Sequence, residues 1–106
     1  MAAPKGTTEF RASVTSADTT TALTIKAGVA GKQIHVVDLV ISVDTAGNYQ
    51  LQDEDGTVVA EQLYLGANGG MAKTWDMPMQ VASGKTLKIL GSASGNVTII
   101  ANGYIQ

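Results

Sequence analysis

The sequence contains no cysteine, only one histidine, two prolines and 5% aromatic residues. Without cysteine, the chain cannot form disulfide bonds, thiolate nucleophiles, zinc–thiolate sites or iron–sulfur clusters. The single histidine, His35, excludes metal sites that need several imidazoles. No segment approaches the roughly 20 consecutive apolar residues that cross a bilayer, and residues 1–6 lack the apolar core of a secretory signal. We therefore expect a protein made in the cytoplasm with no membrane partner.

Charged residues are also scarce, at 15% of the chain against about 25% in an average globular domain. Seven Lys and Arg oppose nine Asp and Glu, which gives a net charge of -2 and no basic excess for a phosphate backbone. Nucleic acid is therefore not expected as a partner. The 106 residues suffice for one hydrophobic core, so we expect one domain. With 44% hydrophobic residues and so little charge, the apolar surface must be buried in that core or against other subunits.

Short runs rich in Val, Ile, Thr and Leu alternate with Gly and Asn, which is typical of many short strands. The pattern predicts an all-β, single-domain antiparallel β-sandwich or jelly roll of about eight short strands over residues 11–106. Residues 1–10 show no periodicity and are predicted to form an extended N-terminal arm. The candidate strands are Arg11–Ser16, Ala22–Ala27, Gln33–Val43, Tyr49–Glu54, Thr57–Leu65, Met71–Trp75, Met79–Val81, Thr86–Leu90 and Val97–Ile105.

Glycines placed between these runs predict the turns. Asp55–Gly56 lies between two alternating runs, and Gly accepts the positive φ of a tight hairpin turn. Ser94–Asn96 is predicted to form a second turn of this kind. Asn102–Gly103 lies within the last candidate strand and is predicted to mark a β-bulge.

The residues that could carry chemistry form no catalytic or cofactor motif. His35 lies inside the longest candidate strand, where we expect it to face solvent or an interface rather than to act as a base. Asp53–Asp55 favours a hairpin turn over a calcium loop, because an EF-hand spreads its ligands over twelve residues; weak surface calcium stays open. The glycine-rich segment Leu65–Gly70 matches neither phosphate-binding fingerprint. We therefore expect no catalytic residue, no cofactor and no enzyme.

Large apolar side chains cluster in one segment, where Met71, Trp75, Met77 and Met79 lie within nine residues. Met and Trp are enriched at protein–protein interfaces, although a small β domain also needs large side chains in its core. Both interpretations remain open from the sequence alone. Phe10 is a candidate anchor at the end of the arm, and Tyr104 lies in a last strand that is tied into the sheet or into a neighbour.

The order of segments from Gly31 to Gln106 resembles small β-sandwich or jelly-roll proteins of tailed-bacteriophage structural gene clusters, including head decoration (cement) proteins. The similarity covers about three quarters of the chain and rests mostly on the order and spacing of the strand and turn segments. The segments that carry it are 32–43, 49–53, Leu65–Gly70, Trp75–Pro78, 83–89 and 97–104.

The resemblance implies a homotrimer that sits on the outer surface of a virus head and clamps neighbouring subunits of the major capsid protein. It offers no catalytic residues. The predicted interface residues are Phe10, Met71, Trp75, Met77, Met79 and Tyr104. The alternative is a receptor- or glycan-binding module of a phage head or tail fibre, which would need exposed aromatic side chains around Tyr49 or Tyr64.

Overall fold

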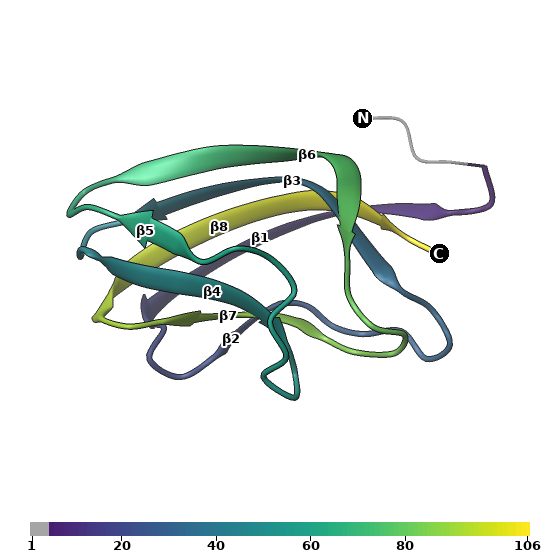
Figure 1. The fold of residues 1–106 in the computed structure, drawn as a ribbon, viewed down its shortest axis with the longest axis horizontal. Coiled ribbons are helices and arrows are strands. Elements are labelled where there is room, and N and C mark those ends of the chain that lie inside the picture. Colours follow the sequence, from purple (N-terminus) through teal and green to yellow (C-terminus); the bar gives the residue numbers. More distant parts are fainter. Residues whose placement is uncertain (1–4) are drawn as a thin grey trace.

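The computed structural model describes residues 5–106, which form eight strands in a compact β-sandwich (Figure 1). No helix in this range is long and apolar enough to cross a membrane. The strands are β1 (Thr8–Asp18), β2 (Leu23–Lys26), β3 (Ile34–Val43), β4 (Gly47–Asp53), β5 (Leu63–Leu65), β6 (Gly70–Gln80), β7 (Leu87–Gly91) and β8 (Ser94–Ile105).

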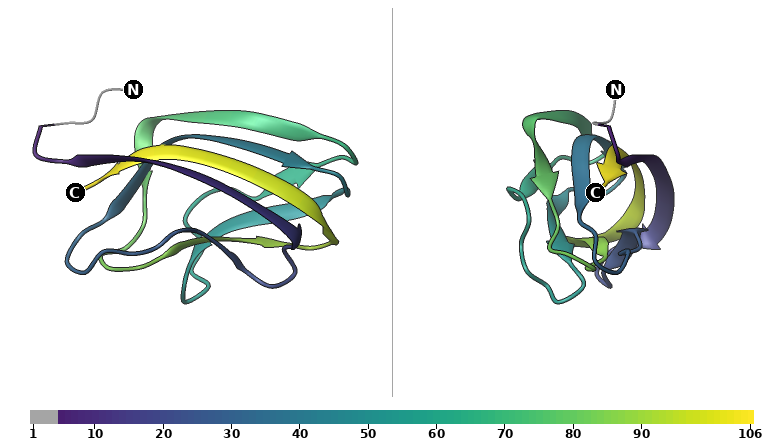
Figure 2. Two further views of the ribbon diagram at one scale, coloured as in Figure 1. Left: turned by 180° about the vertical axis from the view of Figure 1, so that it is seen from behind. Right: turned by 90° about the vertical axis from the view of Figure 1, so that its right-hand side faces the viewer.

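The strands pair only antiparallel, in two four-stranded sheets with the orders β1-β8-β3-β6 and β2-β7-β4-β5. The two sheets lie face to face, and the chain crosses repeatedly from one to the other (Figure 2). This arrangement is that of a jelly roll. The predicted fold class is therefore confirmed. Four strands remain at sheet edges: β1 and β6 in the first sheet, β2 and β5 in the second.

The core lies between the sheets because successive side chains of a strand point to opposite faces. In β3, Leu39, Ile41 and Val43 are buried, whereas Val40 and Ser42 are exposed. In β4, Tyr49 and Leu51 are fully buried. Strand β8 supplies every second residue of its central part to the same core, namely Val97, Ile99 and Ala101. The alternation seen in the sequence is therefore the alternation between core and solvent.

Several predicted boundaries are wrong. Strand β1 begins at Thr8, so the last three residues of the predicted arm, including Phe10, belong to the sheet; residues 1–4 of that arm lie outside the described residues. The predicted strand Thr57–Leu65 is reduced to β5 and one isolated bridge between Gln52 and Val58. The predicted strand Met71–Trp75 and the first two residues of the predicted strand Met79–Val81 belong to the single strand β6, which ends at Gln80.

The predicted Asp55–Gly56 turn is present, with Gly56 at a φ of +84° and its N–H donating to the carbonyl of Asp53 at 3.1 Å. The predicted turn Ser94–Asn96 is wrong, because these residues begin strand β8. Gly95 adopts its positive φ of 153° inside that strand. A positive φ was thus expected correctly at both glycines, but only one of them reverses the chain.

The bulge predicted at Asn102–Gly103 lies in the neighbouring strand instead. Val36 pairs with Gly103 and Asp38 with Asn102, so Val37 of β3 is the extra residue. Gly103 permits this because an added Cβ would overlap the carbonyl oxygen of His35. The glycine marks the close approach of β3 to β8 and not an irregularity of its own strand.

Candidate interaction surface

The structure divides the six predicted interface residues into three groups. Met79 and Tyr104 are buried, with 6% and 9% of their surfaces exposed. Phe10, Met71 and Trp75 are half-buried and pack against the core. Met77 is 83% exposed, the largest fraction among the exposed large hydrophobic residues of 5–106. The apolar segment therefore serves the core at most positions and offers Met77 to solvent.

Met77 is exposed because edge strand β6 loses its pairing with β3 at this point. Asp38 pairs with Thr74 and Val36 with Met79, so one residue of β3 opposes a four-residue excursion of β6, from Trp75 to Pro78. Pro78 cannot donate to a sheet ladder, which suits such an irregular edge. The strand bends sharply here, near the end of the sandwich (Figure 1). We call residues 75–78 the β6 excursion.

The chain before β5 is fastened to β6 through Glu61. The Lys73 ammonium lies 3.2 Å from a carboxylate oxygen of Glu61. A backbone hydrogen bond of Glu61 has the largest effect in holding the pKa of this carboxylate below its usual value, and side-chain hydrogen bonds from Lys73 and, more weakly, Trp75 act in the same direction. The indole of Trp75 is therefore engaged within the subunit, on the side of the sandwich where β5 and β6 form the two sheet edges.

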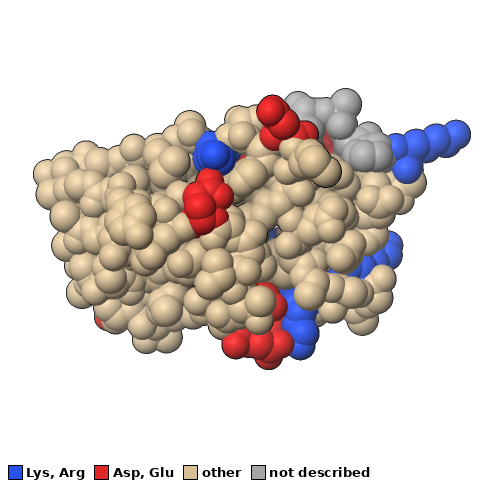
Figure 3. Space-filling model, viewed as in Figure 1, with Lys and Arg blue, Asp and Glu red and all other residues tan. Residues whose placement is uncertain are grey.

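The β5–β6 side of the molecule carries few charges. Figure 3 shows that the half of this face over β5 and the β5–β6 turn is almost free of Lys, Arg, Asp and Glu. Tyr64 of β5 is 73% exposed here. Tyr49, in contrast, is fully buried, and its hydroxyl donates to the carbonyl of Thr45 at 2.8 Å, so Tyr49 cannot be an exposed recognition residue.

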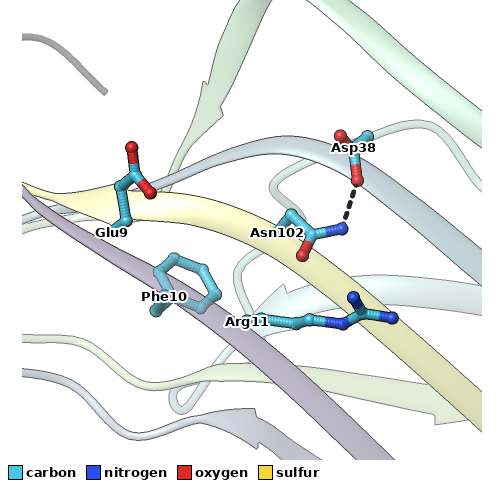
Figure 4. A pocket seen from close by; sticks show the side chains of 5 residues that line it. All are labelled: Glu9, Phe10, Arg11, Asp38 and Asn102. Atoms are coloured by element: carbon cyan, nitrogen blue, oxygen red, sulfur yellow. Dashed lines mark hydrogen bonds between the residues drawn. The ribbon is translucent and has the colours of Figure 1, made fainter. Parts of the chain in front are cut away.

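A shallow hollow of about 440 Å³ lies on the outer face of the first sheet and is lined by Glu9, Phe10, Arg11, Asp38 and Asn102. The side-chain amide of Asn102 donates to a carboxylate oxygen of Asp38 at 2.6 Å, across strands β8 and β3 (Figure 4). No group of three or more His, Cys, Asp or Glu within residues 5–106 is arranged to hold a metal ion.

The acidic residues after β4 have partners within the chain. The buried carboxylate of Asp53 accepts the N–H groups of Asp55 and Thr57 at 2.8 and 3.0 Å. Glu54 accepts the N–H of Thr86 at 2.9 Å, and Asp55 forms an ion pair of 2.8 Å with Lys85. This cluster stabilises the turn and fastens it to the segment before β7.

His35, expected to face solvent or an interface, is instead buried within the subunit, because its ring stacks on Tyr104 of the adjacent strand. The ring centroids lie 4.7 Å apart at an interplanar angle of 13°, and His35 is only 6% exposed. The two residues are direct cross-strand partners on β3 and β8. Burial lowers the pKa of the His35 imidazole below 6.5. Sequence reasoning missed this contact because it joins residues far apart in the chain.

Acidification is expected to destabilise the protein through His35. Its pKa is lowered in the folded state, so the unfolded state binds more protons once the pH falls below about 6.5, and stability then decreases. The slope is at most about 1.4 kcal/mol per pH unit for one proton. Urea unfolding of the wild type and of His35→Phe at a series of pH values gives the free energy of unfolding of each protein. The change of their difference with pH is the contribution of His35. A difference that is independent of pH from 5 to 7, roughly the range in which histidine titrates, would contradict the assignment.

The sequence matches no protein-family model, and the search of curated proteins finds no relative.

Proposed function

We propose that this jelly roll is a non-enzymatic structural protein of a virus head, a decoration protein that binds the outer shell as a homotrimer and stabilises contacts between subunits of the major capsid protein. Jelly rolls occur in viral capsid proteins, and also in lectins and cupins, so the fold alone does not decide the role. The observation that carries the proposal is Met77, a flexible apolar side chain that is 83% exposed to solvent. Such residues are enriched where proteins meet.

The rest of the surface is consistent with this role. The hollow on the outer face of the first sheet is shallow, and its lining consists of an arginine, two carboxylates, an amide and a phenyl ring. The β6 excursion is stabilised within the subunit by Trp75 and buried Met79, so it can present Met77 without ordering a flexible segment on binding. Preorganisation of this kind reduces the entropic cost of association.

Met77→Lys is expected to weaken trimer formation or shell binding by at least about tenfold, because an ammonium group would lose its hydration in the contact. Its thermal stability should stay within about 0.5 kcal/mol of the wild type, since the side chain is 83% exposed. Leu90→Lys is the matched control: Leu90 is 36% exposed, on the outer face of the second sheet.

Light scattering of the purified chain measures trimer formation, and co-sedimentation with undecorated shells measures shell binding. A stable monomer at micromolar concentration would contradict the trimer, and an equal loss in both lysine variants would contradict the assignment to Met77.

The second candidate is a glycan- or receptor-binding module of a phage fibre. It is favoured by Tyr64, whose ring is 73% exposed on β5 opposite Asn48 of β4. Aromatic rings beside amide groups are suited to contact the apolar face and the hydroxyl groups of a sugar. A glycan array that binds the wild type but not Tyr64→Ala would support this candidate over the first.

A further inference from the structure

The two edges of the first sheet differ in how they are protected against pairing with another strand. An edge strand exposes unpaired N–H and C=O groups, which natural proteins shield with bulges, proline or inward-pointing charges. Strand β6 has all three: the β6 excursion, Pro78, and Lys73, which pairs with buried Leu39 and therefore lies on the core-facing side. Strand β6 is therefore protected along its length.

Strand β1 has little of this protection. It is 11 residues long, and residues 12–17, Ala-Ser-Val-Thr-Ser-Ala, contain no charge, proline or glycine. Its register with β8 is regular from Thr8 to Ser16, and its one irregularity lies between Ser16 and Asp18 at the end of the strand. Within residues 5–106, no strand pairs with its outer edge, which is open in the rear view (Figure 2, left).

We propose that β1 pairs antiparallel with β1 of a second copy of this chain across a two-fold axis, which joins two four-stranded sheets into one of eight strands. The other free edges are poor partners for β1, because β2 has four residues, β5 has three and β6 is protected. Strand β6 also has 11 residues, so the identical strand is the one unprotected edge of matching length among residues 5–106. A two-fold contact is also self-complementary, as such interfaces require.

The charges at the ends of β1 suit this arrangement. With the axis at Val14, Arg11 of one copy lies opposite Ala17 of the other and Asp18 lies opposite Phe10, and the arrangement is repeated by symmetry. No two residues of like charge therefore lie directly opposite each other on either side of the uncharged centre.

Two lysine variants distinguish a contact through the edge strand β1 from a contact through the outer face of the sheet. Thr15 of β1 and Thr98 of β8 are direct cross-strand partners, both exposed on the outer face, but only Thr15 is on the edge strand. Thr15→Lys is expected to raise the Kd of the two-fold contact by at least about tenfold, since the axis brings two ammonium groups together. Thr98→Lys should leave it within about threefold. Sedimentation equilibrium gives both constants, and thermal unfolding checks that each variant folds; Ser13→Lys replaces Thr15→Lys if it does not.

The proposal requires an even-numbered assembly of the wild type, a dimer or a pair of trimers, that loses its two-fold contact in Thr15→Lys alone. A wild type found only as monomer or only as trimer would overturn it, and so would equal weakening by the two variants. The proposal does not depend on the proposed function. A wild-type dimer without trimers would support the β1 contact and contradict the trimeric decoration protein. A wild-type trimer that forms no larger assembly and is unchanged by Thr15→Lys would support the trimer and contradict the β1 contact.

Discussion

Gly103→Ala is expected to lower the free energy of unfolding by at least about 3 kcal/mol, the upper part of the range for overpacked sites. An added Cβ would overlap the backbone carbonyl of His35 and approach the Phe10 ring to 2.9 Å. The carbonyl belongs to β3, which is also paired with β6, so it cannot move without disturbing two ladders. A domain of this size is stabilised by about 5–15 kcal/mol in total, so the loss is a large fraction.

Gly66→Ala is the matched control for Gly103→Ala. Its added Cβ would meet no atom within 4 Å, and Gly66 does not have a positive φ. We expect a change within about 0.5 kcal/mol. Calorimetric melting of both variants measures the contrast, with Tm expected to fall by more than about 10 °C for Gly103→Ala. Similar melting temperatures for the two variants would show that β3 and β8 do not approach as closely as described.

Leu51→Ala is expected to cost about 2–5 kcal/mol, because truncating a fully buried leucine loses transfer free energy and leaves a cavity. Leu51 is 0% exposed on β4 and faces the centre of the core between the sheets. Leu90→Ala, at 36% exposure on the adjacent strand β7, should cost well under half as much. Chemical denaturation of both variants gives the two free energies. Equal losses of the free energy of unfolding in the two variants would contradict the burial of Leu51 on the inner face of the second sheet and the exposure of Leu90 on its outer face.

The fold class could be predicted from the sequence because burial follows the period of two along each strand. Leu39, Ile41 and Val43 illustrate this, since each was part of an alternating run and each is buried. Boundaries failed where tertiary contacts override local pattern. Thr57–Leu65 has the composition of a strand, yet it lies mostly in a loop that Glu61 fastens to the edge of the other sheet. The local sequence does not predict the contact of Glu61 with Lys73.

The candidate surface could be predicted only in part. The four large apolar residues Met71, Trp75, Met77 and Met79 indicate a segment with a special role. Their spacing does not reveal the β6 excursion, which exposes Met77 while Met79 beside it is buried. The stacking of His35 on Tyr104 and the burial of Tyr49 likewise depend on which strands become neighbours. Strand order is a property of the whole chain, and no short window of sequence contains it.

The register of β1 with β8 also constrains how the chain folds during synthesis. Thr8 lies opposite Ile105, and β8 lies between β1 and β3 in the first sheet. Strand β1 therefore has no neighbour to pair with until β8 is in place. Since β8 is the last of the eight strands to leave the ribosome, β1 must wait unpaired while the others emerge. Pairing of such distant segments is slow, because loop-closure entropy is lost before the contacts form. Strand β1 is therefore the strand that waits longest for its partner during synthesis.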